Sequence, residues 1–283
     1  MNIDFLYSKF LETNKVSTDT RKPIKGSIFF CLKGPNYNGN QFAYEALKKG
    51  AKLVVIDEKQ KTNESQFILV ENSLKCLQNL AIKHRESLKI PILAITGTNG
   101  KTSTKNLIYD VLNEKFKVIK TIGNFNNHIG LPLSILSIHK TYEFAVLEFG
   151  ASKVGDINEL CEIGKPNYGL ITNIGKAHLE QFKNVENIIK TKTELWRYLI
   201  TKSGFIFINN EDKNLMNIRS EKKIFSTYNK FINYGNKENN IEIHSTSPFL
   251  ELKWGKKIIK TEIVGDYNLT NIFADPLKLQ LCH

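Results

Sequence analysis

Residues 92–103 read Ile92-Leu93-Ala94-Ile95-Thr96-Gly97-Thr98-Asn99-Gly100-Lys101-Thr102-Ser103. The apolar start predicts a short buried strand, the glycines predict a turn, and residues 101–113 have the pattern of a helix. Gly97 and Gly100 let the backbone bend so that its N–H groups face one point, where the helix dipole adds positive potential. The stretch therefore predicts a phosphate-binding loop, in which Lys101 reaches the β- and γ-phosphates and the Thr102 hydroxyl binds their Mg²⁺.

This loop matches the shorter half of the Walker pattern, because the full pattern needs a further glycine where Ile95 stands. Gly-Lys-Thr after an apolar run can also be an ordinary strand-to-helix turn. The choice between the two depends on what the rest of the chain contains.

The composition is that of a globular protein large enough for two domains. The chain has 283 residues, of which 41% are hydrophobic and 10% aromatic. The first residues include Asp4 and carry no basic cluster before an apolar run, so they do not predict a secretory signal. No apolar run of the sequence approaches membrane-spanning length, and we expect a cytoplasmic, monomeric protein without membrane insertion.

Cysteine spacing and charge each argue against a class of site. Cys31, Cys76, Cys161 and Cys282 form no C-x-x-C pair, which indicates reduced thiols rather than disulfides or a zinc site. The net charge is +12, from 40 Lys and Arg against 28 Asp and Glu. No aromatic and basic recognition module accompanies this charge, so anionic nucleotide substrates explain it better than nucleic acid does.

Residues 1–88 are expected to form a small α/β domain. Strands are predicted at 27–32, 53–56 and 67–70, and helices at 41–49 and 73–87. Asp19, Thr20 and Arg21 belong to a polar cluster that could bind a ligand or form a solvated turn.

Residues 89–283 are expected to form a doubly wound central domain. Strands at 117–120, 144–147, 168–172 and 204–208 alternate with helices at 156–163 and 185–200, which predicts a mostly parallel sheet. From Lys223 onward the pattern changes to short strands, with a hairpin that turns at Trp254 and Gly255. The predicted fold class is therefore α/β.

Polar side chains follow two strands of the predicted central sheet. Glu148 ends the strand 144–147, where ligands collect in doubly wound sheets, and is well placed to hold Mg²⁺ opposite Thr102. His178 follows the strand 168–172 on the same rim, where it could be a metal ligand or a structural residue.

Three asparagines stand within four residues of one loop, at Asn124, Asn126 and Asn127. Carboxamides donate and accept hydrogen bonds, which suits phosphate and sugar oxygens. Asparagines also tolerate the left-handed geometry of turns, so the local pattern leaves both interpretations open.

Taken in order, these motifs resemble those of the Mur ligase family of bacterial cell-wall enzymes over nearly the whole chain. The matching segments are 18–21 with 26–29, 34–42, 96–102, 123–127, 148–150, 171–175 with His178, and Asn268 with Asn271. The asparagine loop and the Glu-x-Gly after its strand favour the dipeptide-adding branch over the branch that adds the third amino acid.

The resemblance implies an ATP-dependent ligase that uses Mg²⁺. The ATP-binding residues implied are Gly97, Thr98, Asn99, Gly100, Lys101, Thr102, Ser103, Asn268 and Asn271, although the family usually has His where this chain has Tyr267. Thr102 and Glu148 would hold one Mg²⁺, and His178 a second. The implied catalytic residues are Lys101, Glu148, His178 and Lys192, and Lys192 matches a lysine that some members carry as a carbamate.

The resemblance also implies UDP-N-acetylmuramoyl-tripeptide and D-alanyl-D-alanine as substrates. The uridine nucleotide would be held by Asp19, Thr20 and Arg21, and the muramoyl peptide would face Asn124, Asn126 and Asn127. The tripeptide carboxylate would attack the γ-phosphate of ATP, and the dipeptide amine would then attack the acyl phosphate.

Family members continue into a third α/β domain, which residues 276–283 do not resemble. We therefore expect this domain to be missing from the chain. Two alternatives stay open: another amide ligase of the same group, such as the enzyme that adds the third residue or a folate polyglutamylating enzyme, and a nucleotide-binding remnant without turnover.

Overall fold

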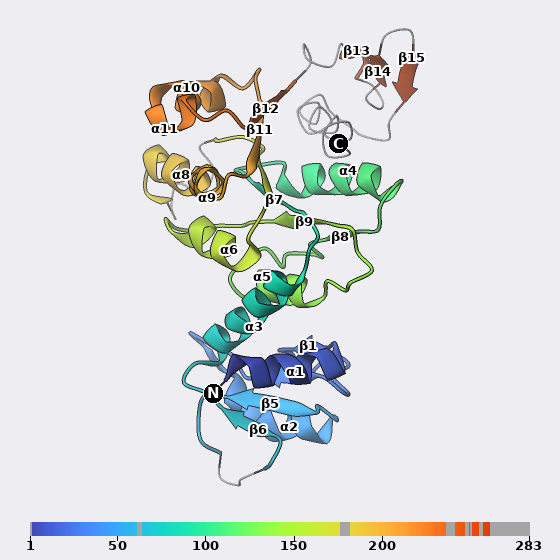
Figure 1. Cartoon of the computed structure of the whole chain (residues 1–283), viewed down its shortest axis with the longest axis vertical. Helices are drawn as coiled ribbons and strands as arrows, with labels where there is room; N and C mark the ends of the chain where they lie inside the picture. Colours follow the sequence, from blue (N-terminus) through green and yellow to red (C-terminus); the bar gives the residue numbers. More distant parts are fainter. Residues whose placement is uncertain are drawn as a thin grey trace. The chain divides into compact units, whose positions relative to one another are not determined.

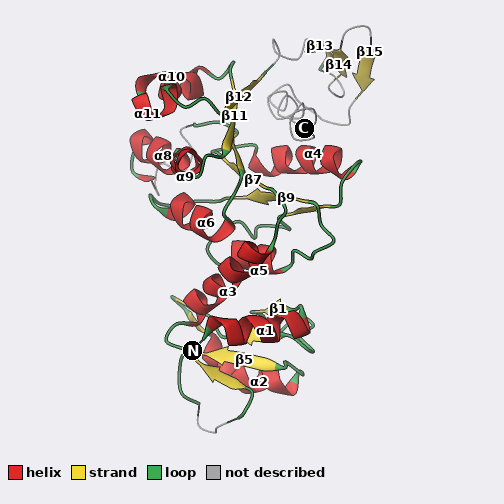
Figure 2. Cartoon of the chain, in the orientation of Figure 1, coloured by secondary structure: helices red, strands yellow, loops and turns green. Residues whose placement is uncertain are grey.

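The computed structural model describes residues 2–60, 64–175, 182–235, 241–246, 249, 251–254 and 257–260. The chain forms two compact units. Figure 1 shows the chain coloured by sequence, and Figure 2 shows it coloured by secondary structure. Unit 1 comprises residues 1–89, 122–140 and 162–164, and unit 2 comprises residues 90–121, 141–161 and 165–283. The expected boundary after residue 88 falls next to the first division, but a single boundary does not predict the two later segments of unit 1.

Unit 1 is built on a parallel sheet with the strand order β1-β2-β5-β6. These strands are β1 (Val16–Ser17), β2 (Ile28–Phe30), β5 (Leu53–Ile56) and β6 (Phe67–Leu69). Helix α2 (Ala43–Lys48) packs against β5 over a buried apolar cluster. Helices α1 (Ile3–Thr13) and α3 (Ser73–Ser87) pack against each other, and α3 also contacts β2. A short hairpin of β3 (Lys33–Gly34) and β4 (Tyr37–Asn38) leads into the 3-10 helix η1 (Gly39–Phe42).

Segment 122–140 contributes helix α5 (Gly130–Leu136), which packs against α3 within unit 1. Gln78 Nε2 of α3 donates to the carbonyl of His128 at 3.2 Å. Nε2 of the buried His84 lies 2.8 Å from the carbonyl oxygen of Ile138. These bonds, with the packing of α5, explain why a segment distant in sequence belongs to unit 1.

Unit 2 is built on a sheet with the strand order β12-β11-β10-β7-β9-β8, in which all neighbouring strands are parallel. The strands are β7 (Ile92–Thr96), β8 (Val118–Lys120), β9 (Phe144–Glu148), β10 (Tyr168–Ile171), β11 (Phe205–Asn209) and β12 (Phe231–Tyr234). The predicted α/β class with mostly parallel sheets is confirmed.

Helices cover both faces of this sheet. Ile108 and Leu112 of α4 (Lys101–Asn113) belong to a buried cluster that also contains Leu170 of β10. The neighbouring Gly169 faces α9 (Glu194–Thr201), since a Cβ there would lie 2.4 Å from Leu199 Cδ1. Successive strand residues point to opposite faces, so α4 and α9 lie on opposite sides and the domain is doubly wound, as predicted.

Two predicted segments of unit 2 are wrong in detail. The single helix expected over 185–200 is divided into α8 (Val185–Lys192) and α9 at Thr193, whose backbone ψ of −3° departs from the α-helical value. The helical backbone bonds continue across this residue, since the Thr193 amide donates to the Ile189 carbonyl and the Arg197 amide donates to the Thr193 carbonyl, each at 3.0 Å. Directly after Lys222, helix α11 (Lys223–Ser226) forms where short strands are expected.

Helix α6 (Asp156–Gly164) follows β9 as predicted, with its last three residues in unit 1. Helix α10 (Lys213–Glu221), which follows β11, was not predicted. An antiparallel sheet contains β13 (Ile241–Ser245), β14 (Glu251–Trp254) and β15 (Lys257–Lys260). Trp254 pairs with Lys257, so the predicted hairpin is present, with its turn outside the described residues.

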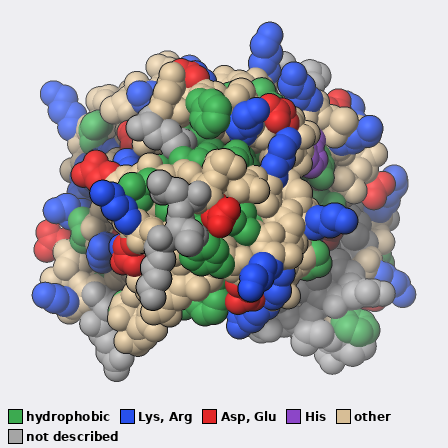
Figure 3. Space-filling view, turned by 90° about the horizontal axis from the view of Figure 1, so that it is seen from below, with side chains coloured by type: hydrophobic (Ala, Val, Ile, Leu, Met, Phe, Trp, Pro, Cys, Tyr) green, Lys and Arg blue, Asp and Glu red, His purple; other side chains and the backbone are tan. Residues whose placement is uncertain are grey.

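One face of the molecule carries both positive and negative side chains. On the face shown in Figure 3, lysine and arginine side chains are scattered among acidic and neutral ones. None of the described helices is both long and apolar enough to cross a membrane.

Candidate active site

The predicted phosphate loop joins β7 to α4. Gly97 has a φ of 146° and Gly100, the N-cap of α4, has a φ of 78°. A Cβ on Gly97 would lie 2.0 Å from Thr172 Oγ1, so only glycine fits at this bend. Helix α4 begins at Lys101 without a side-chain cap, and the first N–H groups of a helix have no partner inside it. Its N-terminus is therefore suited to an anion.

Residues after β10 hold the loop in place. The Thr98 amide donates to the Asn173 carbonyl at 3.0 Å, and the Asn99 amide donates to Asn173 Oδ1 at 3.1 Å. Thr172 Oγ1 and Asn173 Nδ2 both donate to the Asn99 carbonyl, at 2.6 and 3.0 Å. The prediction that the loop amides all face one point is therefore wrong for Thr98 and Asn99, and the amides suited to phosphate are those at the start of α4.

Lys101 folds over the loop that precedes it. Its Nζ donates to the carbonyl oxygens of Gly97 and Thr98, at 2.9 and 3.0 Å. Burial lowers the pKa of this ammonium, and the nearby Glu148 carboxylate opposes the shift. Ser103 is exposed on the first turn of α4.

Thr102 and Glu148 meet as predicted. Thr102 Oγ1 donates to Glu148 Oε2 at 2.9 Å, and the Glu148 amide donates to Thr121 Oγ1 at 2.9 Å. Lys105 Nζ lies 3.6 Å from the same Glu148 oxygen, and both side chains are almost fully buried, at 3% and 4% exposed. The predicted acid is therefore paired with a buried lysine that the motif analysis missed.

The sequence contains an indication that Lys105 is buried. It stands three residues before Ile108 and seven before Leu112, on the stripe of α4 that is buried. A lysine at an apolar position of a helix predicts a buried acidic partner, since an unpaired buried charge is costly.

The Thr102 and Glu148 oxygens could occupy two adjacent ligand positions of a Mg²⁺ ion. They lie 2.9 Å apart, and neighbouring oxygens around an octahedral Mg²⁺ with bonds of about 2.1 Å lie about 3 Å apart. The described residues contain no group of three or more His, Cys, Asp and Glu side chains that could hold a metal ion. Phosphate oxygens and water would therefore supply other ligands, as is usual for this ion.

Lys192 is buried near this loop, with 4% of the residue exposed. Burial and repulsion from Lys101 lower its pKa from 10.5 to about 8, against the attraction of Asp156 and Glu194. Glu194 was not predicted as a site residue. Its carboxylate accepts hydrogen bonds from the amides of Gly155 and Asn158 at 2.8 and 2.9 Å, at the start of α6.

Unit 1 contains a pocket of about 560 Å³ at the predicted nucleotide-binding segment. It is lined by Thr18, Asp19, Thr20, Arg21, Leu32, Lys33, Gly34, Tyr37, Phe42 and Ile129. Asp19 accepts hydrogen bonds from Nε and Nη2 of Arg21, each at 2.9 Å, and this pairing lowers the pKa of Asp19 to about 2.

The asparagine loop lies in the same unit as this pocket. Lys22 Nζ lies 5.4 Å from the centre of the Phe125 ring, and Ile129 lines the pocket. Asn127 Oδ1 accepts from the amides of Ile129 and Gly130, at 3.1 and 2.9 Å, in the turn before α5, whereas Asn124 is exposed and Asn126 is half-buried. The structure therefore brings the two predicted substrate segments together, with Asn127 in a turn role.

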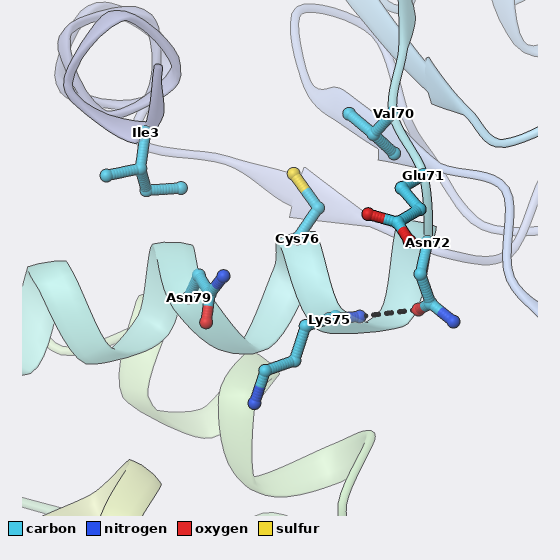
Figure 4. Close-up of a pocket in the computed structure, with 7 residues that line it drawn as sticks. All are labelled: Ile3, Val70, Glu71, Asn72, Lys75, Cys76 and Asn79. Atoms are coloured by element: carbon cyan, nitrogen blue, oxygen red, sulfur yellow. Dashed lines mark hydrogen bonds between the residues drawn. The ribbon is translucent and has the colours of Figure 1, made fainter. Parts of the chain in front are cut away.

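A second pocket of unit 1, of about 550 Å³, lies between α1, α3 and the end of β6. Figure 4 shows Cys76 of α3 pointing into the space between Ile3 and Val70. The one hydrogen bond drawn there is the cap of α3, in which the Lys75 amide donates to Asn72 Oδ1 at 2.8 Å. The Asn72 side chain and the Lys75 amide therefore stabilise the start of α3.

Three predicted site residues, His178, Asn268 and Asn271, lie outside the described residues, as does Tyr267. Their roles remain predictions.

The sequence profile of the Mur ligase middle domain matches residues 95–275. The chain belongs to the Mur ligase family. The family resemblance deduced from the motifs is thereby confirmed, and the glycine loop of β7 and α4 lies inside the matched region.

Individual Mur ligases cover this chain to different extents. The UDP-N-acetylmuramoyl-tripeptide–D-alanyl-D-alanine ligase of Bacillus subtilis (strain 168) is 38% identical over 198 residues, which are 69% of this chain and 43% of that protein. The ligase of the same name from Buchnera aphidicola subsp. Acyrthosiphon pisum (strain APS) is 34% identical over 275 residues, or 95% of this chain and 60% of that protein.

The fold is similar to the crystal structure of MurF ligase from Thermotoga maritima in complex with ADP. The TM-score is 0.79 with 29% identity, over 96% of this chain and 64% of that one. The chain thus spans between 43% and 64% of the length of these relatives.

Proposed function

We propose that this chain carries the substrate pocket and phosphate loop of a ligase that joins D-alanyl-D-alanine to UDP-N-acetylmuramoyl-tripeptide with ATP. The observation that carries the proposal is the pairing of Thr102 with Glu148 at 2.9 Å, beside an uncapped helix N-terminus and Lys101. The names of the two bacterial relatives support the tripeptide and the dipeptide as substrates. The ADP complex of a similar structure supports ATP as the nucleotide.

In this proposal ATP binds at the loop before α4. The N-terminal amides of α4 meet the phosphates, and Lys101 exchanges its two loop carbonyls for phosphate oxygens. Mg²⁺ would be held by Thr102 and Glu148, with His178 proposed at a second ion, and would neutralise charge on the phosphates when bound. Asn99 and Ser103 are exposed beside the phosphates, and Asn268 and Asn271 are proposed near the adenine.

The uridine nucleotide occupies the pocket lined by Asp19, Thr20 and Arg21. Arg21 uses two of its N–H groups on Asp19 and keeps others, on a side chain that is 87% exposed, for an anionic substrate. Asn124 and Asn126 then face the muramoyl peptide, while Asn127 shapes the loop.

The reaction follows from these positions. The tripeptide carboxylate attacks the γ-phosphorus of ATP, which forms an acyl phosphate and releases ADP. The amine of D-alanyl-D-alanine attacks the acyl carbon, loses a proton, and phosphate leaves. Lys101 stabilises the charge that develops on the transferred phosphoryl group.

Lys192 is proposed to act as a carbamate. Its low pKa, about 8, leaves a larger share of neutral amine at neutral pH than an exposed lysine has. The neutral amine adds to carbon dioxide and loses a proton, which converts a buried cation into an anion. A cytoplasmic location, a monomeric state and the absence of a nucleic-acid partner also remain proposals.

The test is ADP release by the purified chain with ATP, Mg²⁺ and UDP-N-acetylmuramoyl-tripeptide, with and without D-alanyl-D-alanine. We expect release that depends on the dipeptide, together with the ligated product in mass spectrometry. In parallel assays that offer other amino acids in place of the dipeptide, ADP release with ligated product would instead support another Mur-type ligase. Binding of ADP without turnover in any assay would support a nucleotide-binding role alone.

Lys101→Ala should lower the dipeptide-dependent rate about 100-fold or more, because it removes a cation from the transferred phosphoryl group. Lys190→Ala, at an exposed lysine of α8, is the matched control and should keep the wild-type rate. Equal rates in Lys101→Ala and the control would contradict the phosphate-loop assignment.

A further inference from the structure

One wall of the unit 1 pocket is anchored by a buried carboxylate. Asp57, directly after β5, has 7% of its side chain exposed and lies outside the residues that line the pocket. Its Oδ1 accepts a hydrogen bond from Asn40 Nδ2 at 2.8 Å and lies 3.1 Å from Lys33 Nζ. Its Oδ2 accepts from the amide of Ser73 at 3.2 Å. One carboxylate therefore joins the loop 32–42 to the start of α3.

Asn40 and Asp57 are joined by two hydrogen bonds, one donated by each residue. This residue is 2% exposed, and its Oδ1 accepts from the Asp57 amide at 3.1 Å. The same stretch is closely packed at Gly39, where a Cβ would lie 2.5 Å from the Leu32 carbonyl oxygen. The loop thus has little freedom to move while Asn40 and Asp57 remain paired.

The loop held in this way presents an aromatic surface to the pocket. The rings of Tyr37 and Phe42 stack with centres 5.7 Å apart and planes 17° from parallel, and both residues line the pocket. Tyr37 is 47% exposed. A flat, partly exposed ring is a surface on which a nucleobase stacks.

We propose that Asp57 is a positioning residue, which acts through Asn40 and Lys33 to hold the loop 32–42 in the conformation that binds the uridine nucleotide of the substrate. This inference rests on the proposed function, because the ligand named is the one that function requires. Asp57 does not touch the ligand, so its effect passes entirely through the loop.

The charge of Asp57 suits this role. Burial alone would raise its pKa, but hydrogen bonds from Asn40, Ser73 and Lys33 outweigh burial and lower the pKa. The side chain is therefore an anion at neutral pH and accepts at both oxygens. In Asp57→Asn one of the two positions becomes an NH₂ group, which would face Asn40 and Lys33 or face Ser73, each a donor.

The experiment compares ligand affinities by isothermal titration calorimetry. Asp57→Asn should bind UDP-N-acetylmuramoyl-tripeptide at least tenfold more weakly than wild type, while its Kd for ADP stays within twofold. Hydrogen exchange of the amides in 33–42 should be at least tenfold faster in Asp57→Asn, with the amides of β5 unchanged. Asn40→Ala is a second variant, which breaks the same pair from the loop side. It should also weaken the binding of UDP-N-acetylmuramoyl-tripeptide.

Glu58→Gln is the matched control. Glu58 contacts Lys33 at 3.0 Å and accepts from Asn38 Nδ2 at 3.2 and 3.0 Å, but its side chain is 46% exposed. Glutamine keeps one acceptor oxygen for Asn38, so this change should alter the Kd less than twofold. A wild-type chain that does not bind the muramoyl substrate would contradict the proposed function and the ligand named here. Wild-type binding with unchanged affinity in both Asp57→Asn and Asn40→Ala would contradict this inference alone.

Discussion

Lys192 is a residue whose charged form is disfavoured by folding. Its pKa falls from 10.5 in the unfolded chain to about 8 in the folded one, chiefly through burial. Between these two values the unfolded state binds more protons, so the free energy of unfolding rises with pH across this window. Below pH 8 the full cost of the buried ammonium is present. A costly buried amine is typical of a functional group rather than of a stabilising one.

Replacing this amine should therefore stabilise the fold. Lys192→Met should raise the free energy of unfolding at pH 7 by up to about 3 kcal/mol and should flatten the rise in stability above pH 8. Urea unfolding at pH 7 and pH 10 measures both effects. Lys190→Met, at an exposed position of the same helix, should change neither, and identical pH slopes in the two variants would argue against a depressed pKa at Lys192.

Single residues of the site were predictable where their partners are local or the motif is shared. Gly97, Gly100 and Lys101 follow from one short stretch, and Glu148 follows from its place at the end of a strand. Asn173 was not predictable in its role, because its bonds to Asn99 depend on β10 lying beside β7. Side-chain partners set by the sheet order cannot be deduced from spacing alone.

At the scale of elements, the pair of Lys105 and Glu148 connects α4 to β9. Both side chains are nearly fully buried, and the charged atoms are 3.6 Å apart. Removing one member of a buried pair leaves the other without its partner, which costs far more than the pair itself contributes. The connection fixes where the start of α4 lies on the end of the sheet.

A double-mutant cycle tests this connection. Lys105→Met should lower the free energy of unfolding by about 3 kcal/mol, and Lys105→Met with Glu148→Gln should lose at least about 1 kcal/mol less than the sum of the single changes. The exposed pair of Lys9 and Glu12, at 2.7 Å, is the control and should couple by less than about 0.5 kcal/mol. Additive losses at the buried pair would show that the two elements are not connected in this way.

Element positions were predicted best where apolar spacing is regular. Helices α3 and α4 have the predicted bounds, and β5 does as well. Helix α5 was missed because Gly130 and Pro132 suggest a loop, yet a proline in the first turn of a helix loses no backbone hydrogen bond. The division at Thr193 was missed because a change in one backbone ψ angle leaves no mark in the hydrophobic pattern.

At the scale of the whole molecule, unit 1 is assembled from segments distant in sequence. Residues 122–140 and 162–164 return to it after β7, α4 and β8 have formed part of unit 2. Arg85 Nε of α3 donates to the Gly164 carbonyl at 2.9 Å, as Gln78 donates to His128. A single boundary, placed from the order of the predicted strands and helices, cannot describe this arrangement because it divides the chain only once.

The return of 122–140 should be necessary for unit 1 to fold. A fragment of residues 1–89 loses the hydrogen bonds of Gln78 and His84 to the carbonyls of His128 and Ile138, and such a bond contributes about 1 kcal/mol net. It also exposes the apolar surface of α3 that α5 covers. Joining residues 122–140 to the fragment through a flexible glycine and serine linker should restore a cooperative thermal transition in circular dichroism.

The matched control is the same fusion with Leu131→Asp. Leu131 of α5 is fully buried, and a carboxylate there removes apolar contact and places an unpaired charge in the core. This fusion should melt like the bare fragment, because the added chain is present but cannot dock. If the bare fragment already melts cooperatively at the temperature of the unmodified fusion, residues 1–89 fold alone, and the returning segment serves the pocket through Ile129 rather than the stability of the unit.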